Sequence, residues 1–320
     1  MTFAHRAATR SLRGSGWALH RGVRVIVDFH THIFPPDVCR TRERYLERDE
    51  WFGQLYCNPQ ARLIPAEELV ASMDASGVDL AVTFGFGWTD AGLCREANDY
   101  VIDAVARFPD RLIGFISVNP VGAVEAEKEI SRCVARGMAG IGELMPDGQG
   151  FSFDQAEVTA PLAEAARHYR LPILTHTSEP VGHVYPGKGT RPFSTVLSFA
   201  ERYPDVTVVC GHWGGGLFLY ELMPKLLGKM KNVFYDTAAS LFVYRDRVFS
   251  ISTQIAPDKI LFGTDYPLIS HERFLRRVRA ADLPPLIERA VLGDNALRVL
   301  GWAPTRPAQE AGRTAGAWNE

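Results

Sequence analysis

Short apolar runs alternate with longer amphipathic segments along most of the chain. Eight of the runs are rich in Val, Ile, Leu and Phe and are as long as one strand. Continuous apolar runs of this length are typical of strands buried on both faces. The predicted strands are residues 23–29, 78–86, 112–118, 138–144, 172–176, 206–211, 232–236 and 260–263.

Helical segments are predicted between most of these strands. Pro65, followed by two glutamates, opens one helix that Gly77 closes, in agreement with the preferences of helix ends. The other predicted helices are residues 98–107, 124–135, 155–169 and 195–202. Eight β/α units in series predict a closed TIM (β/α)8 barrel, whose active site lies where the strands end and the following loops begin.

Length and composition agree with one barrel domain. The chain has 320 residues with 46% hydrophobic content, enough to bury a large core, and we assign residues 23–302 to the barrel. Residues 1–22 contain four arginines and no acidic residue, a bias that resembles an organellar transit peptide but lacks the apolar centre of a secretory signal. A disordered extension or a start codon placed too early explains the segment equally simply. Residues 303–320, rich in Ala, Gly, Pro and Arg, are predicted to be a disordered tail.

Charge and cysteine content narrow the class of partner. The formal net charge is -2 and there is no long basic run, which argues against nucleic acid and against a membrane surface and favours a small-molecule substrate. No run approaches the roughly 20 apolar residues of a membrane span. The five cysteines are scattered without a CxxC pair, so neither a disulfide framework nor a thiolate zinc cluster is expected, and a cytoplasmic location is predicted.

Metal-capable side chains occur at the predicted ends of several strands. His30 and His32 are two residues apart, so that on a strand both project from one face toward one point. Glu143, His176, His212 and Asp265 stand at the ends of the fourth, fifth, sixth and eighth strands. All of them fall on the predicted catalytic rim, and imidazoles with carboxylates are ligands that zinc and similar divalent ions prefer.

On these motifs the chain resembles the amidohydrolase superfamily and, within it, the amidohydrolase 2 family, which includes aminocarboxymuconate-semialdehyde decarboxylase and various hydrolases. The resemblance covers residues 23–302, including the closing segment 293–296. It implies that His30, His32, His176 and Asp265 bind a divalent metal. It also implies that His212 transfers protons or binds a second metal.

Three functions follow from this site. The first is hydrolysis of a small amide, lactone or related carbonyl compound, in which Asp265 takes a proton from a metal-activated water and His212 donates to the carbonyl oxygen. The alternative is non-oxidative decarboxylation of an unsaturated or aromatic acid, with His212 or Asp265 protonating the carbon that loses carbon dioxide. The third, a non-catalytic barrel, is disfavoured by the complete ligand set.

Glu143 decides how many ions to expect. Relatives in the wider superfamily carry a bridging Lys or Glu on the fourth strand, and a bridging Glu143 lets His176 and His212 hold a second ion. Otherwise Glu143 orients a ligating histidine or pairs with a cation. One ion, Zn2+, is the expectation; two ions, or Mn2+ or Fe2+, remain open.

The loops carry the candidate specificity residues. Glu179, His183 and Lys188 lie in the loop after the fifth strand, where Glu179 and Lys188 equally suit an ion pair. Trp88 and Trp213 follow the second and sixth strands as candidate pocket residues. The insert at residues 34–64, rich in arginines and aromatics, suits a lid in which an Arg holds a carboxylate and an aromatic covers a planar ligand, or a contact in a homodimer. The remaining histidines, expected at the surface, are His5, His20, His168 and His271.

Overall fold

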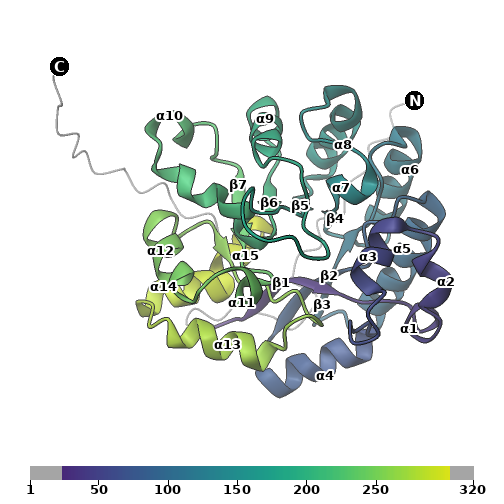
Figure 1. Cartoon of the computed structure of the whole chain (residues 1–320), viewed down its shortest axis with the longest axis horizontal. Coiled ribbons are helices and arrows are strands. Elements are labelled where there is room, and N and C mark those ends of the chain that lie inside the picture. The colour runs from purple at the N-terminus through teal and green to yellow at the C-terminus, as the bar shows by residue number, and fades with distance from the viewer. Residues whose placement is uncertain (1–23, 303–320) are drawn as a thin grey trace, which may run out of the picture.

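Within residues 24–302, which are those that the computed structural model describes, eight parallel strands pair in chain order (Figure 1). The predictions for residues 1–22 and 303–320 lie outside these residues. The strands are β1 (Val27–His32), β2 (Leu80–Phe84), β3 (Leu112–Ile116), β4 (Gly140–Leu144), β5 (Ile173–Thr175), β6 (Val208–Cys210), β7 (Val233–Asp236) and β8 (Ile260–Leu261). All eight predicted strands are confirmed, and β1 extends further than expected, so that His30 and His32 lie within it.

Backbone hydrogen bonds close the ring between its last and first strands. The amide of Phe29 donates to the carbonyl of Phe262 at 2.8 Å, the amide of Asp265 donates to His30 at 2.9 Å, and the amide of His32 donates to Tyr266 at 2.8 Å. The barrel predicted from the alternating pattern is therefore confirmed, and its closure fixes Asp265 beside the two histidines of β1.

Helices surround the strands as an outer layer (Figure 1). The five predicted helices correspond to α4 (Ala66–Ser76), α5 (Ala91–Arg107), α6 (Ala123–Val134), α8 (Ala156–Tyr169) and α9 (Ser194–Arg202). The other α-helices are α1 (Pro36–Arg40), α2 (Glu43–Leu46), α3 (Glu50–Tyr56), α7 (Pro146–Gln149), α10 (Pro224–Leu227), α11 (Ser240–Val243), α12 (Arg247–Ile255), α13 (His271–Ala280), α14 (Pro285–Arg289) and α15 (Asn295–Val299). Two irregular helical turns are η1 (His212–Leu222) and η2 (Ala290–Asp294). None of the helices within the described residues combines the length and apolar character needed to cross a bilayer.

The barrel interior is filled by apolar side chains from alternate strand positions. Phe29, Phe84 and Phe115 belong to this cluster, and Leu297 of α15 joins it. The packed interior leaves polar chemistry to the end of the barrel where the strands finish, as in other barrels of this type.

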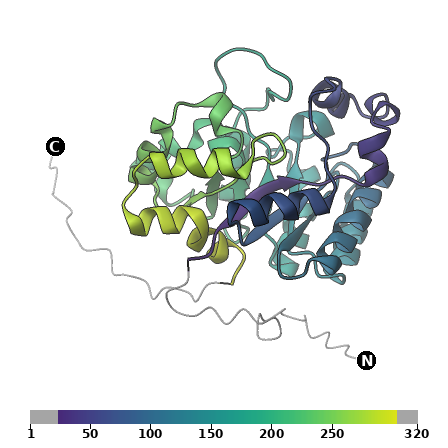
Figure 2. The same cartoon turned by 90° about the horizontal axis from the view of Figure 1, so that it is seen from below.

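The insert after β1 folds as α1, α2 and α3. Figure 2 shows this insert and the loop after β5 rising from the same end of the barrel. An aromatic cluster that includes Phe34, Phe52, Phe86 and Trp88 holds the insert against β2 and the segment that follows it. The insert therefore lies at the end of the barrel where the predicted ligands gather.

The prediction that His271 is a surface residue is wrong. Its side chain is fully buried at the start of α13, with Nε2 3.1 Å from Oδ2 of Asp28 and Nδ1 2.8 Å from Oγ of Ser72. The ring of Tyr266 stacks on the imidazole at 4.6 Å. The first turn of α13 faces the barrel wall, and a helical pattern alone does not reveal that direction. His168 is exposed as expected, and His5 and His20 lie outside the described residues.

Candidate metal centre

A bulge in β1 points both histidines into the mouth of the barrel. Pairing with β2 shifts register between Asp28 and Thr31, and such a bulge re-aims the side chains that follow it. The buried carboxylate of Asp28 accepts from the amide of His30 at 3.1 Å and from the amide of Thr264 at 3.0 Å. Asp28 therefore ties the bulge to the segment that carries Asp265, a function that the sequence pattern did not reveal.

Two histidine nitrogens and two carboxylate oxygens approach one another at the rim. Nε2 of His30 lies 3.5 Å from Oε2 of Glu143 and 3.8 Å from Oδ1 of Asp265. Nε2 of His32 lies 3.7 Å from the same Glu143 oxygen and 3.4 Å from the same Asp265 oxygen. Ligands held at about 2.1 Å from a tetrahedral ion are about 3.4 Å apart, so these separations suit a divalent metal.

The histidine tautomers also fit a metal. Nδ1 of His30 donates to Oδ2 of Asp236 at 2.8 Å, and Nδ1 of His32 donates to the carbonyl of Gly85 at 2.9 Å. Both Nε2 atoms therefore present a lone pair to the centre. Nε2 of His30 is fully buried and has no hydrogen-bond partner among the described residues, as expected for a metal ligand.

Asp236 was missed in the sequence although it ends β7. Its Oδ2 accepts from His30, while its Oδ1 accepts from the amides of His212 and Ala238 at 3.0 and 2.9 Å. Its position at a strand end matched that of the predicted ligands, but the chain contains many aspartates, and only the fold places this one behind His30.

A second group of ligand atoms shares Glu143. Nδ1 of His176 lies 3.1 Å from Oε1 of Glu143 and 3.0 Å from Nε2 of His212, which is itself 3.5 Å from Oε1 of Glu143. Glu143 thus turns one oxygen toward the β1 histidines and the other toward the histidines that follow β5 and β6. The predicted ligands all converge, but His176 lies with His212 and Glu143 rather than within the first group.

Two of these residues have left-handed backbones. His212 has φ of 55° and Asp265 has φ of 62°, conformations that cost non-glycine residues about 1–3 kcal/mol and that concentrate at functional sites. Gly215, with φ of 61°, follows His212 where its backbone approaches the carbonyl of Ser178, so that no Cβ fits. The glycine run after β6 therefore permits the turn that aims His212 into the mouth.

The electrostatics of the cluster favour positive charge at its centre. Burial alone lowers the pKa of His30, but the negative charges of Asp236 and Glu143 outweigh it and leave that pKa well above its usual value. Burial raises the pKa of Asp265, but the hydrogen bond with His32 and the charges of His30 and His212 bring it down to about 2. Burial also raises the pKa of Glu143, but the charge of His30 and hydrogen bonds from His176 and His212 outweigh it and hold that pKa well below its usual range. A cation at this point satisfies both carboxylates.

The candidate residues of the loop after β5 bond to one another. Nζ of Lys188 lies 3.2 Å from Oε1 of Glu179 and donates to the carbonyls of Val181 and His183. Tyr185 donates to Oε2 of Glu179 at 2.8 Å. Glu179 and Lys188 thus form the internal ion pair that was the alternative expectation, and the side chain of His183 is exposed.

The two candidate tryptophans are buried. Trp213 is completely inaccessible, its indole N–H donates to Ser240, and its ring packs at 5.4 Å from Phe249. Trp88 is 2% exposed and lies 4.6 Å from the ring of Phe52. Trp213 therefore packs in the core, and Trp88 supports the insert from beneath.

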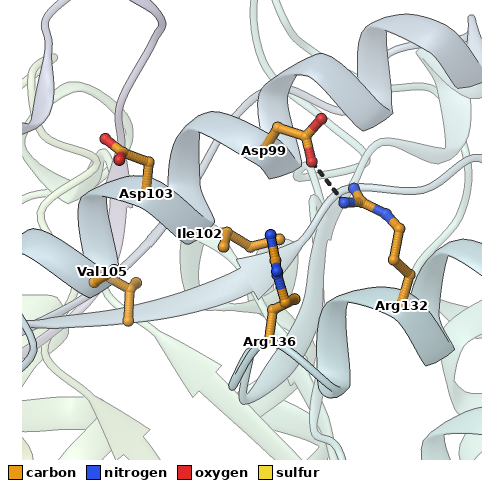
Figure 3. Close-up of a pocket in the computed structure, with 7 residues that line it drawn as sticks. Asp99, Ile102, Asp103, Val105, Arg132 and Arg136 are labelled. Atoms are coloured by element: carbon orange, nitrogen blue, oxygen red, sulfur yellow. Dashed lines mark hydrogen bonds and ion pairs between the residues drawn. The ribbon is translucent and has the colours of Figure 1, made fainter.

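A hollow outside the barrel carries no such chemistry. It lies between α5 and α6 and is lined by Asp99, Ile102, Asp103, Arg132 and Arg136 among others (Figure 3). Asp99 and Arg132 neutralise each other across it at 2.6 Å. The metal-capable groups found among the described residues all belong to the rim.

Comparisons with known proteins agree with this geometry. A family model described as amidohydrolase (Amidohydro_2) matches residues 27–302. The gamma-resorcylate decarboxylase of Polaromonas sp. is 25% identical over an aligned length of 217, which covers 54% of this chain and 65% of that protein, less than two thirds of its length. The 2-amino-3-carboxymuconate-6-semialdehyde decarboxylase of Dictyostelium discoideum is 23% identical over 345 residues, covering 88% of this chain and 92% of the relative.

Solved structures share the fold. The 5-carboxyvanillate decarboxylase of Sphingomonas paucimobilis superposes with a TM-score of 0.71 at 18% identity, covering 87% of this chain and 99% of that one. A dihydroxybenzoic acid decarboxylase of Polaromonas sp. JS666, with bound manganese and the inhibitor 2-nitroresorcinol, gives 0.68 at 17% identity and covers 87% and 97% of the two chains.

Proposed function

Because the chain belongs to the amidohydrolase family whose model matches residues 27–302, we propose that it is a metal-dependent decarboxylase of an aromatic or unsaturated carboxylic acid. One observation carries the proposal. The relative that matches along 88% of this chain and 92% of its own length is a decarboxylase, and this chain has a complete set of ligands for a divalent metal at its barrel mouth. Decarboxylation was the alternative in the sequence analysis, and the comparisons favour it over hydrolysis.

The residues at the mouth have distinct functions in this proposal. His30, His32, Glu143 and Asp265 would hold one divalent ion, which when bound would supply Lewis acidity toward substrate oxygens. Two imidazoles and two carboxylates suit zinc and manganese alike. The manganese in the Polaromonas decarboxylase supports manganese for this site, and elemental analysis distinguishes the two.

His212 is the proposed proton donor. It lies on the rim with 11% of its side chain exposed, and its Nδ1 is within 3.2 Å of the carbonyl of Ala238. Burial lowers the pKa of His212, but hydrogen bonding with Glu143 and the charges of Asp265 and Glu143 raise it above the usual value, which favours the protonated ring that an acid requires. Asp265, with a pKa of about 2, is an anion at neutral pH and suits a ligand better than an acid.

The proposed step balances without a further reagent. The bond between the ring carbon and the carboxyl group breaks, and its electron pair stays on the ring carbon. That carbon takes a proton from His212, carbon dioxide leaves, and His212 recovers a proton from solvent. General acid catalysis of this kind contributes about 10²–10⁴-fold to a rate.

Hydrolysis remains the second candidate because of Glu143. One of its oxygens faces the β1 histidines and the other faces His176 and His212. If ions occupied both groups, they would supply the Lewis acidity that activates water for hydrolysis of a carbonyl compound.

Product analysis on the metal-loaded protein tests the proposal. The panel contains 2,6-dihydroxybenzoate, 5-carboxyvanillate and 2-amino-3-carboxymuconate-6-semialdehyde, with aryl amides and lactones for the second candidate. We expect carbon dioxide release from at least one acid and none from an Asp265→Asn variant. Turnover of only the amides or lactones would overturn the decarboxylase proposal.

A further inference from the structure

The insert after β1 is docked over the rim by two close contacts. A Cβ atom on Gly148 of α7 would lie 2.5 Å from Cγ of Trp51, so the indole packs directly on that backbone. A Cβ atom on Gly187 would lie 2.7 Å from Cδ2 of Leu55, so α3 also contacts the loop after β5. Helix α3 therefore contacts both α7 and the loop after β5.

Aromatic rings lead from the metal centre to the end of α3. The ring of Phe34 stacks on the imidazole of His32 with centroids 6.4 Å apart and an interplanar angle of 15°. Tyr56 meets the ring of Phe34 at 5.5 Å and that of Phe52 at 4.6 Å. The last residue of α3 is therefore two ring contacts from a metal ligand.

The backbone around Tyr56 is fixed from the other side. Nη1 of Arg42 donates to the carbonyls of Asn58 and Ala61 at 3.2 and 2.8 Å and lies 3.5 Å from the carbonyl of Tyr56. Arg40 pairs with Asp37 on the exposed surface. These contacts direct Arg42 to the backbone of the insert and place Arg40 beside an exposed carboxylate.

The hydroxyl of Tyr56 is unpaired among the described residues. The side chain is partly exposed although its ring is surrounded by aromatics. Burial raises the pKa of this phenol, and the charges of Asp265 and Glu143 raise it further. The hydroxyl therefore lies within the field of the metal-binding carboxylates and keeps its proton, so that it acts as a hydrogen-bond donor.

We propose that Tyr56 is a substrate-binding residue, whose ring borders a planar aromatic acid and whose hydroxyl donates a hydrogen bond to an oxygen of that acid. The inference rests on the proposed decarboxylase function, because it assigns Tyr56 to the side of the binding site that faces the ring of the acid. It assigns to α3 the aromatic part of the lid.

Tyr45 offers a matched control within the same insert. It is 9% exposed, packs against Trp88 at 6.1 Å, and has the guanidinium of Arg48 over its ring. Burial and the charges of Asp37 and Glu96 raise its pKa, and neither metal-binding carboxylate is among the main causes. Tyr45→Phe thus removes a hydroxyl from the same aromatic cluster without changing Tyr56.

Binding of 2-nitroresorcinol to the full-length, metal-loaded protein is measured by calorimetry for wild type, Tyr56→Phe, Tyr45→Phe and Tyr56→Leu. We expect Tyr56→Phe to weaken binding about 10- to 100-fold, the range for a hydrogen bond to a charged partner, and Tyr45→Phe to change it less than about twofold. Tyr56→Leu, which also removes the ring, is expected to weaken binding further. Metal content and thermal unfolding should match wild type in both Phe variants.

Equal affinities of Tyr56→Phe and wild type would overturn the inference, as would no binding of the probe to the loaded wild type. The proposed function is read separately, from carbon dioxide release. Release that persists with unchanged KM in Tyr56→Phe overturns the role of Tyr56 alone. If probe binding depends on Tyr56 but no acid releases carbon dioxide, the result supports Tyr56 as a binding residue and contradicts the decarboxylase proposal.

Discussion

Asp236 accepts a hydrogen bond from Nδ1 of His30 at 2.8 Å, and both side chains are completely buried. In Asp236→Asn, the amide oxygen can keep the two backbone N–H bonds, which turns the amide NH2 toward His30. The ring then favours the tautomer protonated at Nε2, where the metal should bind. We expect metal affinity to fall about 10- to 100-fold, measured by competition with a chelator.

Asp246→Asn is the matched control for this substitution. Asp246 is exposed and pairs with Arg277 at 2.8 Å outside the rim. It should leave metal affinity unchanged. Equal affinity in both variants and wild type would show that the bond to His30 does not set the tautomer.

The barrel and the candidate ligands could be predicted because both depend on local sequence patterns. Continuous apolar runs mark buried strands, and side chains such as His176 and Asp265 follow those runs directly. A barrel brings strand ends together whatever the details of packing. The resemblance to a known family then added roles to positions that the pattern had already selected.

The residues that position the ligands could not be predicted because long-range packing determines them. Asp28 acts through a bulge that joins β1 to the segment after β8. The burial of His271 depends on which face of α13 meets the barrel. Tyr56 gains its position from the docking of α3 on Gly148 and Gly187, and glycine contacts of this kind leave no periodic signal.

The number of bound ions tests whether Glu143 binds one ion or bridges two. We propose one ion in the group formed by His30, His32, Glu143 and Asp265, so elemental analysis should give about one ion per chain. His32→Ala is expected to lose it, whereas His176→Ala should keep it. Two ions in wild type that fall to one in His176→Ala would instead establish Glu143 as a bridge and favour the hydrolase.

Metal binding should release protons near neutral pH. The pKa values of His30 and His212 are raised in the absence of a cation, so these rings are protonated to a higher pH than usual. A ligating His30 must lose that proton, whereas Asp265, with a pKa of about 2, is already ionised. Affinity should therefore fall as the pH is lowered and level off once the pH exceeds the raised histidine pKa values.

Calorimetry in two buffers of different protonation enthalpy measures this release. The exposed His168 supplies the control, since His168→Gln should release as many protons as wild type. An apparent enthalpy that is identical in the two buffers between about pH 6 and 8, where histidines titrate, would contradict the expectation.

The buried contact between His271 and Asp28 should matter for stability more than for metal binding. His271→Ala removes a packed ring, but Asp28 keeps donors from His30 and Thr264 and is not left unpaired. We expect the free energy of unfolding to fall by about 2–3 kcal/mol. Removal of the partner of a buried charge, which leaves that charge unpaired, costs more, about 3–5 kcal/mol. Denaturant unfolding measures it. His168→Ala should change stability by less than about 0.5 kcal/mol, and a loss of metal from His271→Ala would place the contact within the site itself.

Replacement of His212 separates proton transfer from metal binding. His212→Asn removes the proposed acid but retains a donor for the carbonyl of Ala238, so the turn after β6 should persist. Carbon dioxide release is expected to fall about 10²–10⁴-fold with metal content unchanged, whereas Asp265→Asn should lose metal and activity together. Because His212 acts as an acid only when protonated, wild-type activity should decline as the pH rises through the pKa of His212, which is raised in the absence of a cation. Reaction in D2O should place deuterium on the carbon that has lost carbon dioxide. If the His212→Asn protein stays active with the same pH profile, another group protonates that carbon.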